Sequence, residues 1–481
     1  MRWLKILGAV AVINVIARLL GFGREVIIGY QYGTSFRADS IITAFTIPNF
    51  IYLVVGGAIT TAFISVQSKL SKDKQTRFRQ NIFTLLTIIL GALSLVSILF
   101  AAFWIDLFFS GMSPEAAELT TKLYQVMAPA SLFLVIGMWL SGLWNMEGHY
   151  RFTAFSTLLF NGLFLLIGVA FTQALATFSY AIGATIGSLA MALTLYIAWQ
   201  KKYGPIPMQW KWQANQNELA RFIKLSVPIL FGGATLQFYF FIQRIFAAQL
   251  EEGLIASINY ATKMTQFPQA ILMTSVTTVI YPLLAKAIGD GQEEKVGRIY
   301  QKGVRWLVLL LVPATVYLYV YAEQIIRLIF EYGAFDQLST ARTFPLLQWF
   351  AFSMLPLALT TFITRFFYAK EQSYLPVFYS LLSVFGINLV IIVGWLEELG
   401  PFAIALGTVV ATIVNMVLLC ISAYVRYSYT IGRLGYVVFS VAGGFVIWGS
   451  SLLLDANDWV MLIGGGLITG VWILAGLRLY R

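Results

Sequence analysis

The sequence holds a single cysteine, Cys420, and a single histidine, His149. One cysteine excludes an intramolecular disulfide and a cysteine-based metal cluster, and one histidine excludes most histidine-dependent catalysis and metal binding. The sequence also has no Walker A phosphate loop and no cluster of His, Asp and Glu of the kind that a membrane enzyme uses. We therefore expect no enzyme, no ATP hydrolysis within this chain, no metal and no cofactor.

Charge is scarce as well. Only 11% of the residues are charged, where soluble domains carry roughly 25%, while 59% are hydrophobic and the mean hydropathy is +0.79. A soluble core able to hide so much apolar surface is implausible for 481 residues. The net charge of +11 lies in the connections between apolar runs, so its expected partner is the anionic cytoplasmic leaflet of a membrane and not a nucleic acid.

Apolar runs of roughly 20 residues, the length that crosses a bilayer, recur along the whole chain. They predict an all-α integral membrane protein with about fourteen spanning helices. The predicted spans are 5–31, 38–66, 80–108, 119–146, 152–172, 176–199, 222–249, 254–287, 303–324, 343–369, 374–396, 401–425, 434–454 and 458–479.

Lys and Arg cluster in alternate connections, chiefly within 69–79, 201–224 and 286–305, and the connections between them carry few. Because basic loops stay on the cytoplasmic side, this alternation predicts that the N- and C-termini are both cytoplasmic. The exceptions are Arg37 and a mixed connection that holds Arg327, Glu331, Asp336 and Arg342. The first run is interrupted by Arg18 and Arg24, so we interpret it as a retained membrane helix and not as a cleaved signal.

The chain also repeats itself at an offset of roughly 220 residues, which indicates two similar halves. Residues 43–48 and 263–268 each end in a proline, and 104–111 resembles 325–333. Six helices per half give both halves the same orientation in the membrane. We predict an N-terminal six-helix lobe (1–200), a cytoplasmic basic linker (201–221), a C-terminal six-helix lobe (222–432) and two appended helices (433–481). Two such lobes form a transporter architecture.

Charged residues inside spanning helices cost about 2.5–3.5 kcal/mol each and therefore need a role. The first span contains Arg18 and Arg24, which lie about 120° apart around a helix and roughly 9 Å apart along it. Asp39 begins the second span and can pair with one of them. Lys263 lies in the repeat-equivalent span of the second half, and Arg244, in the outer third of the span 222–249, is a further cation that needs a partner. These five residues are the predicted substrate-binding site.

Guanidinium groups match phosphate oxygens with two parallel hydrogen bonds, which favours an anionic, phosphate-bearing substrate. The structural alternative is that these cations extend to the membrane surface or pair with helix-end carbonyls and Asp39. The sequence leaves that alternative open, most of all for Arg24 and Arg244.

The residues Ala17-Arg18-Leu19-Leu20-Gly21-Phe22-Gly23-Arg24-Glu25, followed by Tyr32-Gly33, Ala38-Asp39 and Ala44-Phe45-Thr46-Ile47-Pro48-Asn49, resemble the MurJ (MviN) lipid II flippases. This family belongs to the multidrug/oligosaccharidyl-lipid/polysaccharide exporter superfamily. The resemblance returns at 260–268. It implies two six-helix lobes, alternating access, and a multi-pass protein of the bacterial cytoplasmic membrane with a part in peptidoglycan biosynthesis and cell shape.

The resemblance further implies a substrate, a site and an energy source. The substrate would be a polyprenyl-diphosphate-linked cell-wall precursor, lipid II first, with cell-wall synthesis proteins as partners. The family's first-helix arginines fall on Arg18 and Arg24, its acidic partner on Asp39 and its second-lobe cation on Lys263. Membrane potential or a coupled monovalent ion would drive transport, and the appended helices would flank a groove for the lipid tail.

This sequence departs from the family pattern at Thr46, Tyr52-Leu53, Gly57 and Thr262, where the family carries charged residues. A less charged cavity keeps a lipid-linked anion as the expected substrate, with another polyprenyl-linked glycan as an alternative to lipid II. Two alternatives come from other classes. A cation-coupled small-molecule exporter would favour acidic groups in its cavity. The second alternative is a non-transporting membrane protein: a scaffold would have no need of the two-lobe repeat, and a glycosyltransferase would show an acidic cluster.

Overall fold

The computed structural model describes residues 2–208, 216–233, 235–432, 434–453 and 457–480, and the side chains of residues 2–9, 11, 216, 231–233 and 235 lie outside this description. Throughout these ranges the regular structure is helical, without a β-strand. The chain forms two compact units, Met1–Ile28 with Ser35–Ile255 and Gly29–Thr34 with Ala256–Arg481. This division does not test the predicted lobe boundaries at 200, 221 and 432, which remain predictions.

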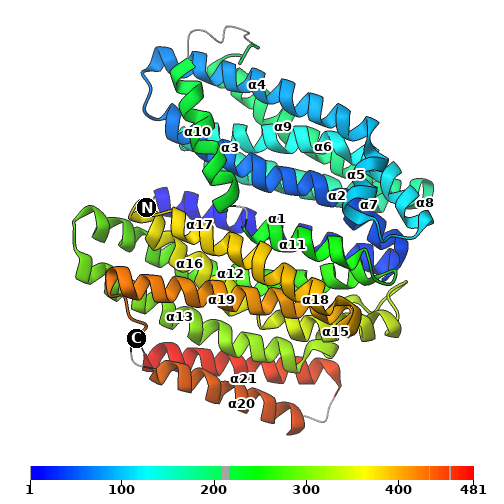
Figure 1. Cartoon of the computed structure of the whole chain (residues 1–481), viewed down its shortest axis with the longest axis vertical. Helices are drawn as coiled ribbons and strands as arrows, with labels where there is room; N and C mark the ends of the chain where they lie inside the picture. Colours follow the sequence, from blue (N-terminus) through cyan, green and yellow to red (C-terminus); the bar gives the residue numbers. More distant parts are fainter. Residues whose placement is uncertain (1, 209–215, 234, 433, 454–456, 481) are drawn as a thin grey trace. The chain divides into compact units, whose positions relative to one another are not determined.

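The first unit takes up most of α1 (Arg2–Tyr32) and the helices as far as the start of α12 (Figure 1). Its second span is a single helical segment in which α2 (Phe36–Phe50) continues through the π-helical segment η1 (Ile51–Gly56) into α3 (Gly57–Gln67). The remaining helices are α4 (Lys72–Leu99), α5 (Ala101–Phe109), α6 (Pro114–Met146), α7 (Tyr150–Ala170), α8 (Thr172–Leu175), α9 (Phe178–Tyr203), α10 (Gln216–Gly233) and α11 (Thr235–Ala247).

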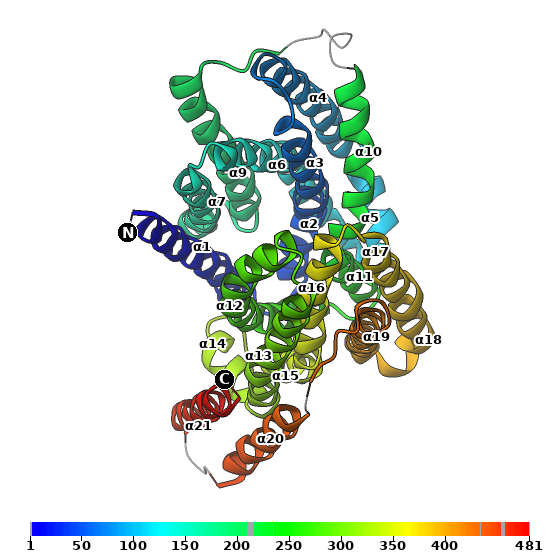
Figure 2. The same cartoon turned by 90° about the vertical axis from the view of Figure 1, so that its left-hand side faces the viewer.

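The second unit begins within α12 (Leu254–Gly289) and runs to the end of the described chain. Its appended helices, α20 and α21, lie side by side in both views (Figure 1 and Figure 2). The helices of this unit are α13 (Glu293–Val320), α14 (Ala322–Phe330), α15 (Gln337–Ala351), α16 (Met354–Ala369), α17 (Tyr374–Leu381), η3 (Leu382–Asn388), α18 (Leu389–Leu399), α19 (Pro401–Tyr427), α20 (Gly435–Leu453) and α21 (Asp458–Leu479).

The described residues contain 11 helices that are long and apolar enough to cross a membrane, or 12 if the bent pair α15 and α16 forms one span. The chain is thus a multi-pass, all-helical membrane protein, but the predicted total of fourteen spans is not confirmed. The predicted spans 5–31 and 222–249 are helical, as α1 and as α10 with α11, yet they are not among these 12.

The basic clusters lie on helices more than in loops, which corrects the prediction that placed them in the connections. The cluster at 69–79 falls mostly on the first two turns of α4, and the cluster at 286–305 falls on the end of α12 and the start of α13. Lys and Arg are good helix formers, so a helix can continue past its apolar part without a penalty. Hydropathy alone therefore predicts helices that are too short, with the starts of α4 and α13 placed about ten residues too late.

The core of the first unit is built around α6, which packs against α2, α4 and α9. The fully buried Trp139 of α6 meets the ring of Phe63 edge-on at 5.4 Å, and Phe63 stacks on Phe78 of α4 at 5.5 Å. Burying an aromatic side chain contributes on the order of 1.5–3 kcal/mol, so this cluster fixes α3, α4 and α6 together. Because α2 continues through η1 into α3 and also packs on α6, the helix that carries Asp39 and Thr46 is held against this core.

Small residues let the helices of the second unit approach closely, as the glycine run at 464–466 suggests. A methyl group at Gly465 of α21 would lie 2.4 Å from the ring of Tyr321, so only glycine fits there. Tyr317 donates a hydrogen bond to the carbonyl of Leu462 at 3.0 Å, and Trp472 donates one to Phe439 at 3.1 Å. The outer faces of α20 and α21 expose large apolar side chains, as expected for helices in contact with lipid.

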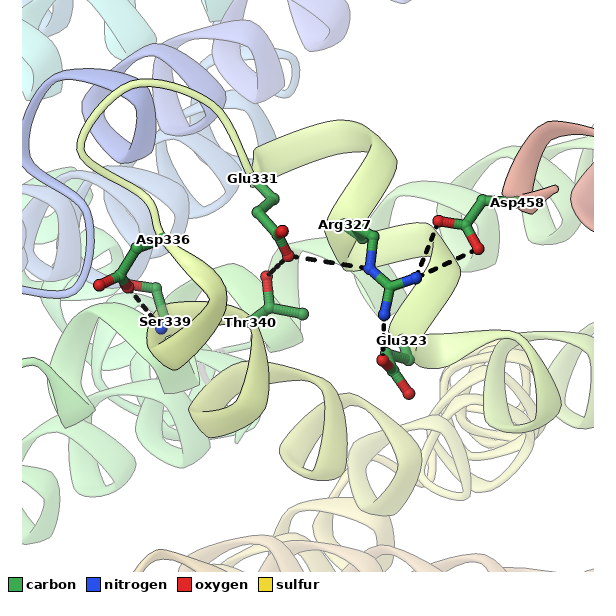
Figure 3. A network of polar contacts seen from close by, with 7 residues as sticks. All are labelled: Glu323, Arg327, Glu331, Asp336, Ser339, Thr340 and Asp458. Atoms are coloured by element: carbon green, nitrogen blue, oxygen red, sulfur yellow. Dashed lines mark hydrogen bonds and ion pairs between the residues drawn. The ribbon is translucent and has the colours of Figure 1, made fainter.

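The mixed connection that departs from the charge alternation forms a polar network in the second unit (Figure 3). Arg327 of α14 binds Asp458, the first residue of α21, with Nη1 3.0 Å from Oδ2, and it also contacts Glu323 and, at 3.9 Å, Glu331. Its hydrogen bond to Asp458 raises the pKa of Arg327. The pair of Arg327 and Asp458 thus ties α14 to α21, which gives Arg327 a structural role.

Candidate functional site: a guanidinium cluster in the first unit

Arg24 lies near the end of the first-unit part of α1, and its side chain is only 12% exposed. Its Nη2 donates to Oε1 of Glu25 at 2.6 Å, and Glu25 itself is buried. The guanidinium also lies over the rings of Phe164 and Phe45, 4.3 Å and 5.5 Å from their centroids. A cation between one carboxylate and two aromatic faces is stabilised without water, so Arg24 is held in place inside the protein.

Arg244 of α11 adds a second guanidinium to this part of the unit. Its Nη1 donates to the hydroxyl of Thr46 at 3.0 Å, and it lies near enough to Arg24 and Glu25 to interact with their charges. Thr46 is buried in α2 and is fixed by its own hydrogen bond to the carbonyl of Ile42. We call Arg24, Glu25, Thr46 and Arg244 the guanidinium cluster. It brings two guanidinium groups and one carboxylate close together within the unit.

Arg18 lies six residues before Arg24 on α1, which is helical throughout this stretch despite Gly21 and Gly23. Its side chain is exposed and forms no hydrogen bond or ion pair with any residue that the structure describes. Gly21 lets α1 approach α7, since a methyl group there would lie 3.4 Å from the amide oxygen of Asn161. Arg18 therefore offers a guanidinium that is available to a ligand.

Asp39 does not act as the carboxylate of Arg24 in this structure, where that contact belongs to Glu25. Asp39 is 3% exposed, and its Oδ2 accepts a hydrogen bond from the backbone N–H of Gly253 at 2.6 Å. Gly253 directly precedes α12, so the carboxylate lies at the positive end of that helix. Its observed contact is with a helix end, and its predicted role in the binding site remains a prediction.

Lys263 lies on α12, in the second unit, and is half-buried. Lys263 and the guanidinium cluster belong to different units. A cavity shared by the two remains a prediction. Of the five predicted site residues, the structure brings Arg24 and Arg244 together, leaves Arg18 exposed on the helix of Arg24, and gives Asp39 a separate partner. Sequence analysis did not assign a role to Glu25, Phe45 or Phe164. A charged residue within an apolar run was the signal for Glu25.

No group of three or more His, Cys, Asp or Glu side chains that could hold a metal ion occurs among the described residues. What the guanidinium cluster can do chemically follows from its charge and geometry. Arginine in a water-poor setting binds carboxylate and phosphate oxygens strongly, because the charges are poorly screened and the donors are already oriented. The cluster is suited to bind an anion and has no nucleophile or paired acid and base.

Comparisons with known proteins agree on one family. A family model described as "Lipid II flippase MurJ" matches residues 28–462. A "Probable lipid II flippase MurJ" of Buchnera aphidicola subsp. Acyrthosiphon pisum is 26% identical over 457 residues, covering 91% of this chain and 87% of that protein. The "Lipid II flippase MurJ" of Burkholderia cenocepacia is 25% identical over 380 residues, covering 76% and 73%.

Solved structures share the fold. A lipid II flippase MurJ in an inward closed conformation superposes with a TM-score of 0.86 at 21% identity, with 98% of both chains covered. An inward-facing multidrug resistance transporter of the MATE family, from the MOP superfamily, follows with a TM-score of 0.74 at 12% identity, covering 86% of this chain and 94% of that one. The family model covers most of the sequence, and the fold agrees with it. This chain belongs to the lipid II flippase MurJ family.

Proposed function

We propose that this protein carries lipid II, a polyprenyl-diphosphate-linked cell-wall precursor, from the inner to the outer leaflet of a bacterial cytoplasmic membrane. Membership of the family supports this proposal, and one observation carries it further. The guanidinium cluster places Arg24 and Arg244 near the carboxylate of Glu25, among apolar helices. Two guanidinium groups are costly to hold among apolar helices, and an anionic ligand that contacts both would lower that cost.

A diphosphate is the anion that best fits this arrangement. Each guanidinium can donate two parallel hydrogen bonds to phosphate oxygens, and Arg18 supplies a further exposed guanidinium on α1. We propose that Arg18, Arg24 and Arg244 bind the diphosphate of the substrate and that Lys263 contributes from the second unit. Glu25 would keep Arg24 oriented while the site is empty. Asp39 would take part through the start of α12, because it accepts a hydrogen bond from the N–H of Gly253, the residue before that helix.

The remaining features of transport are part of the same proposal. The substrate would be exposed to one side of the membrane at a time, with both termini cytoplasmic and membrane potential or a monovalent ion as the energy source. Helices α20 and α21 would flank the path of the lipid tail, in keeping with their exposed apolar faces. Cell-wall synthesis proteins are the proposed partners. No covalent bond would be made or broken.

Another lipid-linked glycan would use the same diphosphate contacts, so the guanidinium cluster alone does not separate it from lipid II. A cation-coupled exporter of small molecules would need a free acidic group for its cargo. The carboxylate at the cluster, Glu25, is already bound by Arg24. The cluster therefore favours an anionic cargo over a cationic one.

Complementation tests the role of the arginines. Arg18→Ala and Arg24→Ala variants that reach the membrane at normal levels are expected not to support growth of cells depleted of their own lipid II flippase. Arg37→Ala is the matched control, because Arg37 is an exposed arginine on α2 outside the cluster. Full rescue by both site variants would reduce these two residues to structural anchors.

Native mass spectrometry tests the substrate class. The purified protein is expected to retain a polyprenyl diphosphate, with or without sugars, in preference to the uncharged polyprenol of the same length. The preference should be lost when Arg24 and Arg244 are both replaced by glutamine. Equal binding of the charged and uncharged lipids by the unaltered protein would eliminate the proposed function.

A further inference from the structure

A cavity of about 270 Å³ lies in the first unit between α1, η1, α6, α7 and α9. Its volume corresponds to roughly nine water molecules, since one water occupies about 30 Å³ in the liquid. None of the eleven residues that line it is charged. The cavity is therefore distinct in chemistry from the guanidinium cluster, although both belong to the same unit.

Several polar groups in the cavity wall are not engaged by the protein. Asn14, Tyr52 and Ser141 form no hydrogen bond with any residue that the structure describes, and none of them is fully buried. The amide oxygen of Asn145 accepts a hydrogen bond from Thr153 at 3.0 Å, which leaves the amide nitrogen of Asn145 available as a donor. The cavity thus presents two amides, a phenol and a hydroxyl to whatever occupies it.

These groups select a class of ligand. Amides and hydroxyls both donate and accept hydrogen bonds, as a sugar ring with hydroxyl and acetamido substituents requires. An acyl chain would leave the four polar groups without partners, at a cost of roughly 1–3 kcal/mol for each group that becomes buried. A phosphate or an ammonium group would find no opposite charge in the wall. An uncharged, hydroxyl-rich group fits best.

The position of the cavity on α1 suggests how such a group would arrive. Asn14 precedes Arg18 by four residues, so the two side chains lie on one face of the helix about 6 Å apart along its axis. In a glycosyl diphosphate the first sugar is bonded directly to the diphosphate. A diphosphate bound at Arg18 would therefore place its sugar about one helical turn away, at the cavity.

We propose that this cavity is a subsite for the first sugar of a lipid-linked diphosphate, and that Asn14, Tyr52, Ser141 and Asn145 supply its hydrogen bonds. The inference rests on the proposed function, because it takes the substrate to be a glycosyl diphosphate. It assigns different parts of the substrate to two sites of the first unit. The arginines recognise the charged diphosphate, and the neutral cavity distinguishes a glycosylated lipid from a bare one.

The test compares two probes, undecaprenyl diphosphate and the same lipid carrying one N-acetylated amino sugar, by native mass spectrometry of the full chain. The unaltered protein is expected to bind the glycosylated probe roughly tenfold more tightly, as one to two net hydrogen bonds would give. In a Ser141→Ala, Asn145→Ala variant this ratio should fall to about one, while binding of the bare diphosphate is unchanged.

Tyr52→Phe is the second variant, because it removes a single oxygen and keeps the ring that fills the wall. It should lower the ratio by a smaller factor without affecting the fold. Ser110→Ala is the control, since Ser110 is exposed and outside the cavity, and it should leave the ratio unchanged.

The outcomes separate this inference from the proposed function. A preference for the sugar that persists at full strength in the folded variants would overturn the subsite. Binding of both probes with equal affinity by the unaltered protein would also overturn it, while leaving the diphosphate site intact. Failure of both probes to bind better than undecaprenol would instead overturn the proposed function.

Discussion

Two arginines of this chain differ in their exposure and in the number of carboxylates around them. Arg24, in the first unit, has one carboxylate and two phenylalanine rings around it, and its side chain is 12% exposed. Arg327, in the second unit, has three carboxylates within 4 Å, from Glu323, Glu331 and Asp458, and its side chain is 41% exposed (Figure 3). The buried arginine thus has fewer anionic partners than the exposed one.

This difference separates a binding group from a structural one. Around Arg327 the negative charges outnumber the positive one and water screens them, so no further anion is attracted. Around Arg24, a second cation, Arg244, lies close enough to interact with its charge, and the Arg24 side chain is largely buried. A buried arginine with few anionic partners in the protein can be stabilised further by an anionic ligand.

The largest effect is expected from breaking the Arg24 pair. Glu25→Gln leaves the Arg24 cation without its carboxylate in a buried site and should destabilise the protein by about 3–5 kcal/mol. The double variant Arg24→Gln, Glu25→Gln removes both charges and should recover most of that loss, yet it should not transport. Thermal unfolding in detergent and complementation measure the two properties. Recovery of transport along with stability would show that the pair is only structural.

A smaller effect is expected from Arg244. Arg244→Ala removes one guanidinium and should weaken binding of a polyprenyl diphosphate roughly tenfold or more, as the loss of a charge-assisted hydrogen bond predicts. Thr46→Val removes only the hydroxyl that Arg244 contacts and should weaken binding less. The two affinities can be compared by native mass spectrometry. An equal loss in both variants would mean that Thr46, and not the charge, controls the site.

A modest effect on stability is expected at the start of α15. Asp336 accepts hydrogen bonds from the N–H and hydroxyl of Ser339, both at 2.8 Å, which lowers the pKa of its carboxyl group. Its contribution is therefore present above the ordinary aspartate pKa and is lost as pH falls through the lowered value. Asp336→Ala should cost about 1 kcal/mol at neutral pH. Asp336→Asn should keep the cap and remove this part of the pH dependence, as unfolding curves between acidic and neutral pH can show.

The smallest effect is expected at Arg327, despite its three partners. Because the pairs are exposed, Arg327→Ala should cost only about 0–1 kcal/mol, and less at high salt than at low salt. Transport should be unchanged in complementation. A loss of transport in a variant with normal stability would contradict the distinction drawn between the two arginines.

The sequence predicted the class of the molecule because that class depends on composition and length. Runs of apolar residues placed most helices, and Arg24 and Arg244 stood out as costly charges within them. Helix ends were less predictable, since Lys72 to Arg79 extend α4 beyond its apolar part and hydropathy does not register a polar helical turn.

The partners within the site could not be predicted in the same way. Phe164 is 140 residues from Arg24 along the chain, and only the packing of α7 against α1 brings its ring over the guanidinium. Asp39 was expected beside an arginine, but the start of α12 offers it an amide at the positive end of a helix. Such pairings depend on how helices pack and leave no periodic signal in one sequence.

The connection between the units has a mechanical consequence. The chain passes between the units three times, within α1 after Ile28, after Thr34, and within α12 after Ile255. Two of these crossings are within helices, and the third is in the short loop between α1 and α2. Any pivoting of one unit against the other has to bend α1 just one turn, about 6 Å, beyond Arg24. A headgroup bound to Arg24 would therefore contact α1 close to the point at which this helix passes into the second unit. At that point a small displacement of the helix changes its bending angle most.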